Sequence, residues 1–250
     1  MHLSCAEITL CVKYVRVNMT HLEHLFQLVP NLESVPILDV GAGKGAFVIA
    51  ATQAGYDAIG VEYNPVYIED ANRAAREAGA AIRIVQGAGE KLPFPDSSFG
   101  FVNLSEVIEH VDDPLLLLRE VYRVLRPGGR AYLSAPNRFG IKDPHFHLYF
   151  VNWLPRRFAN PFISLFGTHK NYEDKSAGRQ NLMNMHYYTY SAIRNLVRPE
   201  GFTVIDIRAY RISRSLGKSF GFLVAPVYFV ARTLYFDSFH LLLTKTPRSL

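Results

Sequence analysis

The chain is poor in cysteine and tryptophan, with two cysteines and one tryptophan among 250 residues. Cys5 and Cys11 do not form a CxxC pair, and so low a count excludes a disulfide-stabilised scaffold and indicates a reducing compartment. The sequence has no zinc-finger spacing and no RNA-binding pattern of aromatics and glycines, so nucleic acid is not an expected partner. Residues 1–17 interrupt their apolar stretch with charges and lack a small-residue cleavage pattern, so we expect no signal peptide and a cytoplasmic location.

Composition indicates a globular protein with a sizeable core. Hydrophobic residues make up 49% of the chain, and its length suits one substantial α/β domain with a lid. The formal net charge is +5, which is compatible with anionic partners but is not gathered in one basic tract. Internal repeats and low-complexity segments are also lacking.

The most informative stretch runs from Pro36 to Phe47 and reads PILDVGAGKGAF. A short apolar run is followed by glycines at positions 41, 43 and 45, and then by a run of helix-forming composition. This pattern predicts a buried strand, a tight turn and the start of a helix. Glycine allows positive φ and lets a ligand lie directly on the main chain, while free N–H groups at the helix start suit polar or anionic atoms.

A second acid follows at the distance expected for a nucleoside-binding fold. Residues 57–62 form another predicted strand that ends in Glu62, roughly 20 residues after Gly41, where dinucleotide-binding folds hold a ribose. Gly41-x-Gly43-x-x-Ala46 also satisfies the fingerprint for NAD. Asp39, inside the first strand, and Gly45, which makes the spacing GxGxG, argue against NAD.

Strands and helices then alternate, which implies a doubly wound parallel sheet with its ligand at the carboxyl ends of the strands. We expect a helix over 65–78 capped by Asn64 and one from Pro114 to about Leu125 that ends in a PGG turn. A short helix over 191–197 should follow its cap, Thr189. The further strands are expected at 82–85, 98–104, 130–134, 203–209 and 239–244.

With Asp39, Glu62 and the segments below, residues 36 to about 137 resemble the class I S-adenosylmethionine-dependent methyltransferases. The resemblance implies an α/β, Rossmann-like sheet of seven strands, mostly parallel with an antiparallel last strand pair and helices on both faces. It also implies that S-adenosylmethionine is the cofactor, with Asp39 orienting its amino group and Glu62 holding its ribose. The implied cofactor-binding residues are Asp39, Gly41, Ala42, Gly43, Glu62, Tyr63, Ala88, Gly89, Glu90, Leu104 and Ser105.

Residues 86–96, QGAGEKLPFPD, resemble the family segment after strand three, where G-D-A-E-x-L-P-F is usual. The acid that accepts from the adenine amino group in the family falls on Ala88 here. We expect main-chain atoms of Ala88 and Gly89 to read the adenine edge, with Glu90 as a substitute for the missing acid.

Acids and histidines mark the part of the site where the molecule that accepts the methyl group would bind. Glu106, Glu109 and His110 resemble the ExxEH segment of ubiquinone-pathway O-methyltransferases and of small-RNA 2′-O-methyltransferases, and they are the candidate catalytic residues. In those relatives the segment contributes to a divalent metal site; here metal is the less favoured alternative, with a fourth ligand to come from His145 or His147. His145, His147 and Tyr187 are otherwise the candidate substrate-binding residues.

The expected organisation has four parts: an N-terminal cap helix (1–35), a cofactor-binding core (36–135), a lid or substrate insertion (136–190) and the C-terminal part of the same sheet (191–250). The last part holds an apolar helical insertion at 220–236, which we expect to be buried or to lie at an interface rather than to span a membrane. A second apolar and basic stretch contains Phe158, Phe162, Ile163, Leu165 and Phe166, flanked by Arg156, Arg157 and Lys170. Such stretches suit a lipidic ligand or peripheral membrane contact, and ordinary core or dimer packing is the equal alternative.

These features predict S-adenosylmethionine-dependent methyl transfer, by preference O-methylation of a small apolar or aromatic acceptor. Two alternatives stay open. An NAD-dependent oxidoreductase would use the same glycines but would leave Asp39, LPFPD and the PGG turn unexplained. A non-catalytic cofactor-binding module is supported by Ala88 alone.

Overall fold

The computed structural model describes residues 29, 31–166 and 185–246. Residues 1–28 of the predicted N-terminal cap helix and residues 167–184 of the predicted lid therefore lie outside the described residues. The described part of the chain divides into two compact units. The first comprises residues 29, 31–104, 116–132 and 245–246, and the second comprises residues 105–115, 133–166 and 185–244.

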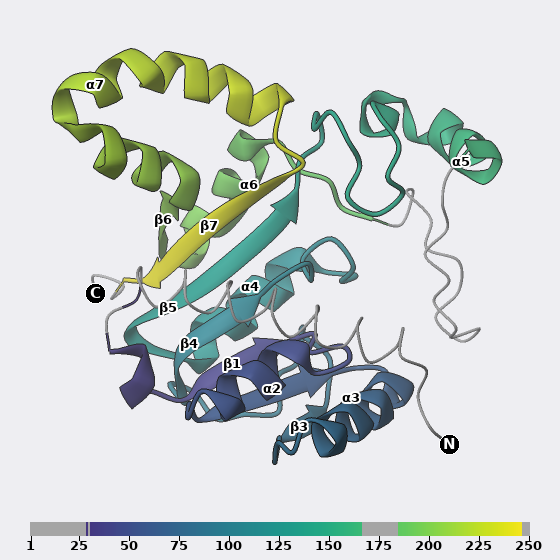
Figure 1. Cartoon of the computed structure of the whole chain (residues 1–250), viewed down its shortest axis with the longest axis vertical. Coiled ribbons are helices and arrows are strands. Elements are labelled where there is room, and N and C mark those ends of the chain that lie inside the picture. Colours follow the sequence, from purple (N-terminus) through teal and green to yellow (C-terminus); the bar gives the residue numbers. More distant parts are fainter. Residues whose placement is uncertain (1–28, 30, 167–184, 247–250) are drawn as a thin grey trace. The chain divides into compact units, whose positions relative to one another are not determined.

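The fold is a seven-stranded sheet with the strand order β3-β2-β1-β4-β5-β7-β6 (Figure 1). It is mostly parallel, and its last strand pair is antiparallel, as the resemblance implied. The strands are β1 (Ile37–Val40), β2 (Ala58–Glu62), β3 (Ile84–Gln86), β4 (Phe99–Leu104), β5 (Leu125–Pro136), β6 (Phe202–Asp206) and β7 (Ser238–Lys245). The α-helices are α2 (Ala46–Gln53), α3 (Pro65–Glu77), α4 (Pro114–Val124), α5 (Arg156–Phe166), α6 (Tyr190–Val197) and α7 (Ile207–Leu234).

In the first unit, β1 is the central strand and pairs in parallel with β2 on one side and β4 on the other. All four of its residues are buried, as expected for a parallel strand covered on both faces. Asp39 is in register with Gly60 of β2 and with Asn103 of β4. The carboxyl ends of these strands therefore meet at one edge of the sheet, directly beneath the glycine turn.

Local signals explain where the helices of this unit begin. Asn64 caps α3, since its Oδ1 accepts the Val66 N–H at 3.0 Å, and Pro65 occupies the first helical position. Gly45 caps α2 with φ 76°, and a Cβ added there would lie 2.9 Å from the Cβ of Ala71. Gly45 therefore serves close packing of α2 on α3 as well as the turn.

Two strand boundaries differ from the sequence prediction by three residues or more. β5 begins at Leu125 rather than Arg130, because the glycine-containing bend, with Gly128 at φ 75°, stays within the extended segment. β6 ends at Asp206 rather than Ala209. The Asp206 carboxylate accepts the Ala209 N–H at 3.1 Å and so caps α7, a helix start that the apolar pattern concealed.

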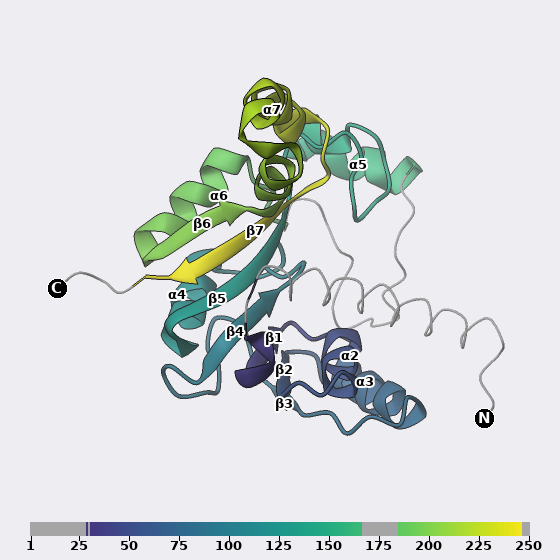
Figure 2. The ribbon, with the colours of Figure 1, turned by 60° about the vertical axis from the view of Figure 1, so that its left-hand side comes forward.

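The apolar insertion predicted at 220–236 is the second half of α7, which curves back on itself (Figures 1 and 2). A straight helix would separate Asp206 and Tyr228 by about 33 Å, yet the Tyr228 hydroxyl donates to Asp206 at 2.7 Å. Helices bend most often at proline and glycine, and α7 contains Gly217, Gly221 and Pro226. Among the described residues, no helix has the length and apolar character that crossing a membrane requires.

Candidate active site

The glycine turn joins β1 to α2 and leaves its backbone open. Gly41 and Gly43 have φ values of 68° and 52°, a conformation that side-chain-bearing residues rarely adopt. A Cβ added at Gly43 would meet nothing closer than the Gly41 carbonyl oxygen, 4.0 Å away. Ala42, between these two glycines, is buried and donates its N–H to Val61 O at 2.9 Å. One side of the turn is therefore hydrogen-bonded to β2, and the backbone of its other side is open to a ligand.

Glu62 fixes the turn from the end of β2. Its Oε2 accepts the Gly43 N–H at 2.7 Å and its Oε1 accepts the Asn64 N–H at 2.9 Å, although the residue is only 8% exposed. Each oxygen keeps a second lone pair that can accept a ribose hydroxyl. The exposed ring of Tyr63 follows directly. The open turn, the buried acceptor and the neighbouring aromatic ring fit a nucleoside cofactor.

Asp39 is buried one strand away from Glu62 and accepts a hydrogen bond from Asn103 Nδ2 at 2.7 Å. Burial raises the pKa of Asp39 to about 7; the Asn103 bond opposes this shift, and the negative charge of Glu62 adds to it. A cationic group placed beside Asp39 would favour the carboxylate form. Asn103 was not predicted, because an isolated polar residue on a buried strand carries no local signal.

The segment after β3 is held by one arginine. Arg123 of α4 donates to Leu92 O, Phe94 O and the carboxylates of Asp96 and Glu120, at 2.7–3.1 Å. Glu120 in turn accepts the Leu92 N–H at 2.8 Å, and the bond from Arg123 lowers the pKa of Glu120. The LPFPD loop is thereby clamped to α4.

The clamp fixes the end of the predicted adenine segment. Ala88, Gly89 and Glu90 are half-buried, and Ala88 forms an isolated bridge with Lys91 at the start of the clamped loop. Leu104 is fully buried at the end of β4, and Ser105 follows it in the chain. Arg123 itself carried no site signal in the sequence, since an arginine on an amphipathic helix is usually a surface residue.

In the second unit, Glu109 and His145 form a buried acid–histidine pair. They are 1% and 4% exposed, and Glu109 Oε1 lies 3.6 Å from His145 Nε2, within ion-pair range but too long for a hydrogen bond. Among the described residues, Glu109 Oε2 and both ring nitrogens of His145 have no hydrogen-bond partner. Buried polar atoms seldom stay unpartnered without a functional reason.

His110 lies at the exposed edge of this pair. Its ring meets that of His145 edge to face, with centroids 5.4 Å apart. One ligand atom from each of Glu109, His110 and His145 can be chosen so that all three lie within 4.8 Å of one another. This mixed nitrogen and oxygen donor set could hold a divalent cation such as Zn²⁺ or Mn²⁺.

A second acid, Asp143, holds His145 in place. The Asp143 carboxylate accepts the N–H groups of His145 and Phe146 at 2.9 and 2.6 Å, and it accepts the Tyr187 hydroxyl at 2.5 Å. Tyr187, predicted to bind substrate, therefore supports this turn. Asp143 is fully buried. Its place before Pro144, where an aspartate often caps a turn, is the signal that could have found it.

The other predicted acceptor-side residues lie outside the three-residue cluster. Glu106 is exposed in a left-handed conformation at φ 56°, and its N–H donates to Ser134 Oγ at 2.8 Å. His147 is exposed on the same turn as His145. A further histidine, His186, has its Nε2 3.1 Å from Val111 O, and its backbone N–H donates to Glu109 O, which ties His186 to the loop that carries Glu109.

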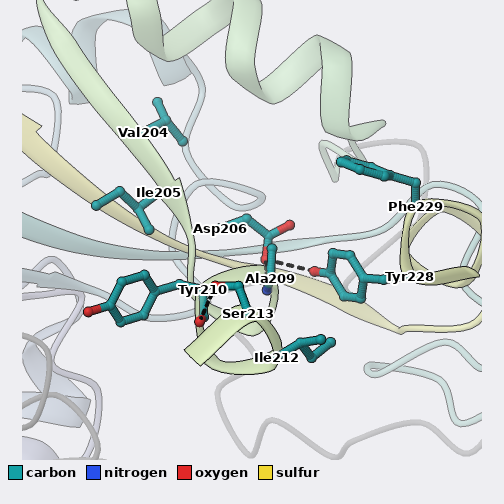
Figure 3. A pocket seen from close by; sticks show the side chains of 9 residues that line it. All are labelled: Val204, Ile205, Asp206, Ala209, Tyr210, Ile212, Ser213, Tyr228 and Phe229. Atoms are coloured by element: carbon teal, nitrogen blue, oxygen red, sulfur yellow. Dashed lines mark hydrogen bonds between the residues drawn. The ribbon is translucent and has the colours of Figure 1, made fainter. Parts of the chain in front are cut away.

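A separate cavity of about 410 Å³ lies between β6 and the two limbs of α7 (Figure 3). Apolar side chains line most of it, and its polar contacts include the bond between Tyr228 and Asp206, which point toward each other, and the bond from Ser213 to the Tyr210 carbonyl (Figure 3). None of the predicted site residues lines this cavity. Asp206 also caps α7 and lies 3.4 Å from Arg232. Its carboxylate therefore stabilises the helix and gives no sign of a ligand site in this cavity.

Replacing Arg123 tests whether the clamp prepares the adenine segment. We expect Arg123→Ala to weaken S-adenosylmethionine binding several-fold and to lower the free energy of unfolding by about 2 kcal/mol, because hydrogen bonds to charged groups are lost. Arg126→Ala removes the same charge from an exposed position and should change neither quantity. Titration calorimetry and thermal unfolding measure both, and equal affinities for the two variants would contradict the clamp.

The raised pKa of Asp39 has a consequence for stability. The folded state binds this proton more tightly than the unfolded chain, so stability falls as pH rises from about 4 to about 7 and stays lower above that. Asp39→Asn should therefore stabilise the protein more at pH 8 than at pH 5.5, by about 1–2 kcal/mol or several degrees in Tm. The exposed-site control Glu77→Gln should show no such difference. A gain that is independent of pH would refute the shift.

Comparison with known proteins agrees with this geometry. A family model described as a methyltransferase domain matches residues 38–133. An uncharacterized methyltransferase of Bacillus subtilis, YcgJ, is 36% identical over 121 residues, which cover 48% of this chain and 47% of YcgJ. A ubiquinone biosynthesis O-methyltransferase of Azorhizobium caulinodans is 33% identical over 144 residues, covering 56% of each chain.

Solved structures share the fold over most of the chain. The crystal structure of YcgJ has a TM-score of 0.59 at 20% identity and covers 93% of this chain and 99% of that one. An S-adenosylmethionine-dependent methyltransferase of Mesorhizobium loti has a TM-score of 0.56 at 16% identity, covering 88% of this chain and 95% of that one. In sequence, this chain spans about half the length of these two curated relatives. The segment 38–133 therefore matches the methyltransferase domain in sequence, and the chain shares its fold with S-adenosylmethionine-dependent methyltransferases of known structure.

Proposed function

We propose that this protein transfers the methyl group of S-adenosylmethionine to a hydroxyl of a small apolar or aromatic acceptor. The observation that carries the proposal is the buried Glu109–His145 pair with its unpartnered ring nitrogens and carboxylate oxygen. A hydroxyl must lose its proton to become a strong nucleophile, and a histidine beside a carboxylate is suited to accept it. The named O-methyltransferase relative supports the same reaction class.

The donor side rests on the residues of the first unit. When bound, S-adenosylmethionine supplies a methyl group already activated by its sulfonium. The chain then has to hold the cofactor and align the acceptor, and alignment alone can contribute several kcal/mol. Glu62 would accept the ribose hydroxyls while it holds Gly43, and Asp39 would face the amino group. Backbone atoms of Ala88 and Gly89 would read the adenine edge above the loop that Arg123 clamps.

The acceptor side rests on the second unit. His145 accepts the hydroxyl proton, and Glu109, 3.6 Å from its Nε2, stabilises the resulting imidazolium. Asp143 fixes the backbone of His145, so the ring keeps its place as its charge changes. His110 at the exposed edge is available to position the incoming hydroxyl. Glu106 lies outside the three-residue cluster and is assigned no proton transfer.

The test compares two histidines of one turn. We expect His145→Ala to lower kcat about 10²–10⁴-fold, the usual contribution of general acid–base catalysis, with the affinity for S-adenosylmethionine unchanged. His147→Ala, at an exposed position two residues on and outside the three-residue cluster, should keep kcat, and any role of His147 in binding the acceptor would change KM alone. The assay measures transfer of labelled methyl to an alkylated catechol and to an alkylamine of similar size. Transfer to the amine alone, or undiminished turnover by the His145 variant, would overturn O-methylation through this pair.

The same cluster gives a second expectation, because its three donors could also hold a divalent cation. With proton transfer assigned to Glu109 and His145, dialysis against a chelator should leave kcat within about two-fold of its starting value, since no step requires a metal. Activity lost on chelation and restored by Zn²⁺ or Mn²⁺ would instead assign the cluster to metal binding. Elemental analysis of the purified protein provides an independent measurement.

A further inference from the structure

Helix α5 has one broad apolar face, and only part of it is covered. Ala159 and Ile163, one turn apart, are buried and pack in a cluster with Phe146, Val151 and Met185. Phe158, Phe162, Leu165 and Phe166 continue this face beside the two buried residues and are 39–77% exposed. A helix that needed only to cover the core would carry polar residues along this exposed part. The exposed part of the apolar face is therefore a surface on which a partner can dock.

The turn that leads into α5 extends this face. Tyr149, Phe150 and Trp153 are 42–63% exposed, and the rings of Phe150 and Trp153 meet edge to face at 5.6 Å. We call these three residues and the four exposed residues of α5 the aromatic surface. The Trp153 Nε1–H already donates to Gly140 O at 3.1 Å, so burial of the ring in an apolar phase would leave no polar atom unpaired. So many exposed large apolar side chains together indicate an interaction site.

The charged residues near the aromatic surface indicate which kind of partner it fits. Residues 144–166 contain Arg156 and Arg157 but no aspartate or glutamate. Helix α7, which lies at the same end of the second unit as α5 (Figures 1 and 2), carries four arginines and one lysine and also no acid. It exposes Val227, Phe229 and Val230. Apolar helices whose own charged residues are all cationic are complementary to an anionic bilayer.

We propose that the aromatic surface docks this protein on an anionic lipid bilayer, with α5 lying in the interface. The exposed phenylalanines and Leu165 enter the acyl boundary, and Arg157 stays with the headgroups. A second copy of the chain is the poorer occupant, because a symmetric contact would bring arginines together with no acid from this segment to neutralise them. Since docking requires no turnover, its test is independent of the proposed methyl transfer.

Vesicle co-sedimentation of the full chain tests the proposal. We expect binding to phosphatidylcholine vesicles that contain phosphatidylglycerol, weaker binding to phosphatidylcholine alone, and a loss of binding as salt is added. The double substitution Leu165→Glu with Phe166→Glu should lower partitioning at least ten-fold, and Arg157→Gln should lower it about five-fold. The control Val66→Glu changes an exposed apolar residue of α3 and should bind as the unaltered chain does.

Three results would overturn the proposal. The first is no binding to the anionic vesicles, and the second is unchanged binding by the double variant. The third is a concentration-dependent dimer in sedimentation velocity that the double variant abolishes, since this would assign the surface to self-association. Circular dichroism and thermal unfolding confirm that each variant is folded, and because Arg157 is exposed, its replacement keeps the test usable if the double variant is unstable.

Discussion

The hydrogen bond from the Gly43 N–H to Glu62 is the interaction on which the donor side depends. It joins the glycine turn to the end of β2 and places a carboxylate with spare acceptor capacity beside an open stretch of backbone. A carboxylate buried there needs donors, and the turn and Asn64 provide them. Its negative charge also raises the pKa of Asp39 on the neighbouring strand, so the two acids are not independent. A ligand that brings positive charge would offset both the desolvation of the Asp39 carboxylate and its repulsion by Glu62, so binding of a cationic group and the protonation of Asp39 are linked.

The glycine turn and the elements around it could be predicted from the sequence because their signals are local. Gly41, Gly43 and Gly45 mark a turn by residue type alone, Asn64 and Thr189 mark helix starts, and apolar runs separated by turns mark the parallel strands. Asn103 and Arg123 were missed since each acts through partners that are distant along the chain. β6 was extended too far because Asp206 reads as part of an apolar strand, whereas its side chain caps the helix that follows. The reversal of α7 could not be foreseen from composition, because it depends on the long-range contact between Asp206 and Tyr228.

The acceptor side shows how a spacing motif and a folded cluster differ. ExxEH suggested that Glu106, Glu109 and His110 act together, yet the three-residue cluster replaces Glu106 by His145, which comes from a turn more than 30 residues later. That turn is ordered by Asp143, whose two carboxylate oxygens both accept hydrogen bonds, from three donors in all. Glu109 and His145, by contrast, keep atoms that have no hydrogen-bond partner among the described residues. Asp143 thus makes its hydrogen bonds within the protein, whereas Glu109 and His145 keep polar atoms that could bond to a substrate. This arrangement is expected where a reacting group must enter.

The aromatic surface and the acid–histidine pair share one structural support. Phe146, the residue after His145, packs in the same cluster as Ala159 and Ile163 of α5, so the helix that presents aromatic side chains outward also steadies the turn that holds the histidine. Replacing residues on the buried face of α5 would therefore disturb both properties together, whereas changes on its exposed face separate them. If α5 lies in a lipid interface, the His145 turn is fastened to the helix that touches lipid, and an acceptor dissolved in the bilayer would reach the protein from that side. The apolar acceptor of the proposed reaction and the docking of α5 then follow from a single physical requirement, which is access to a substrate that water dissolves poorly.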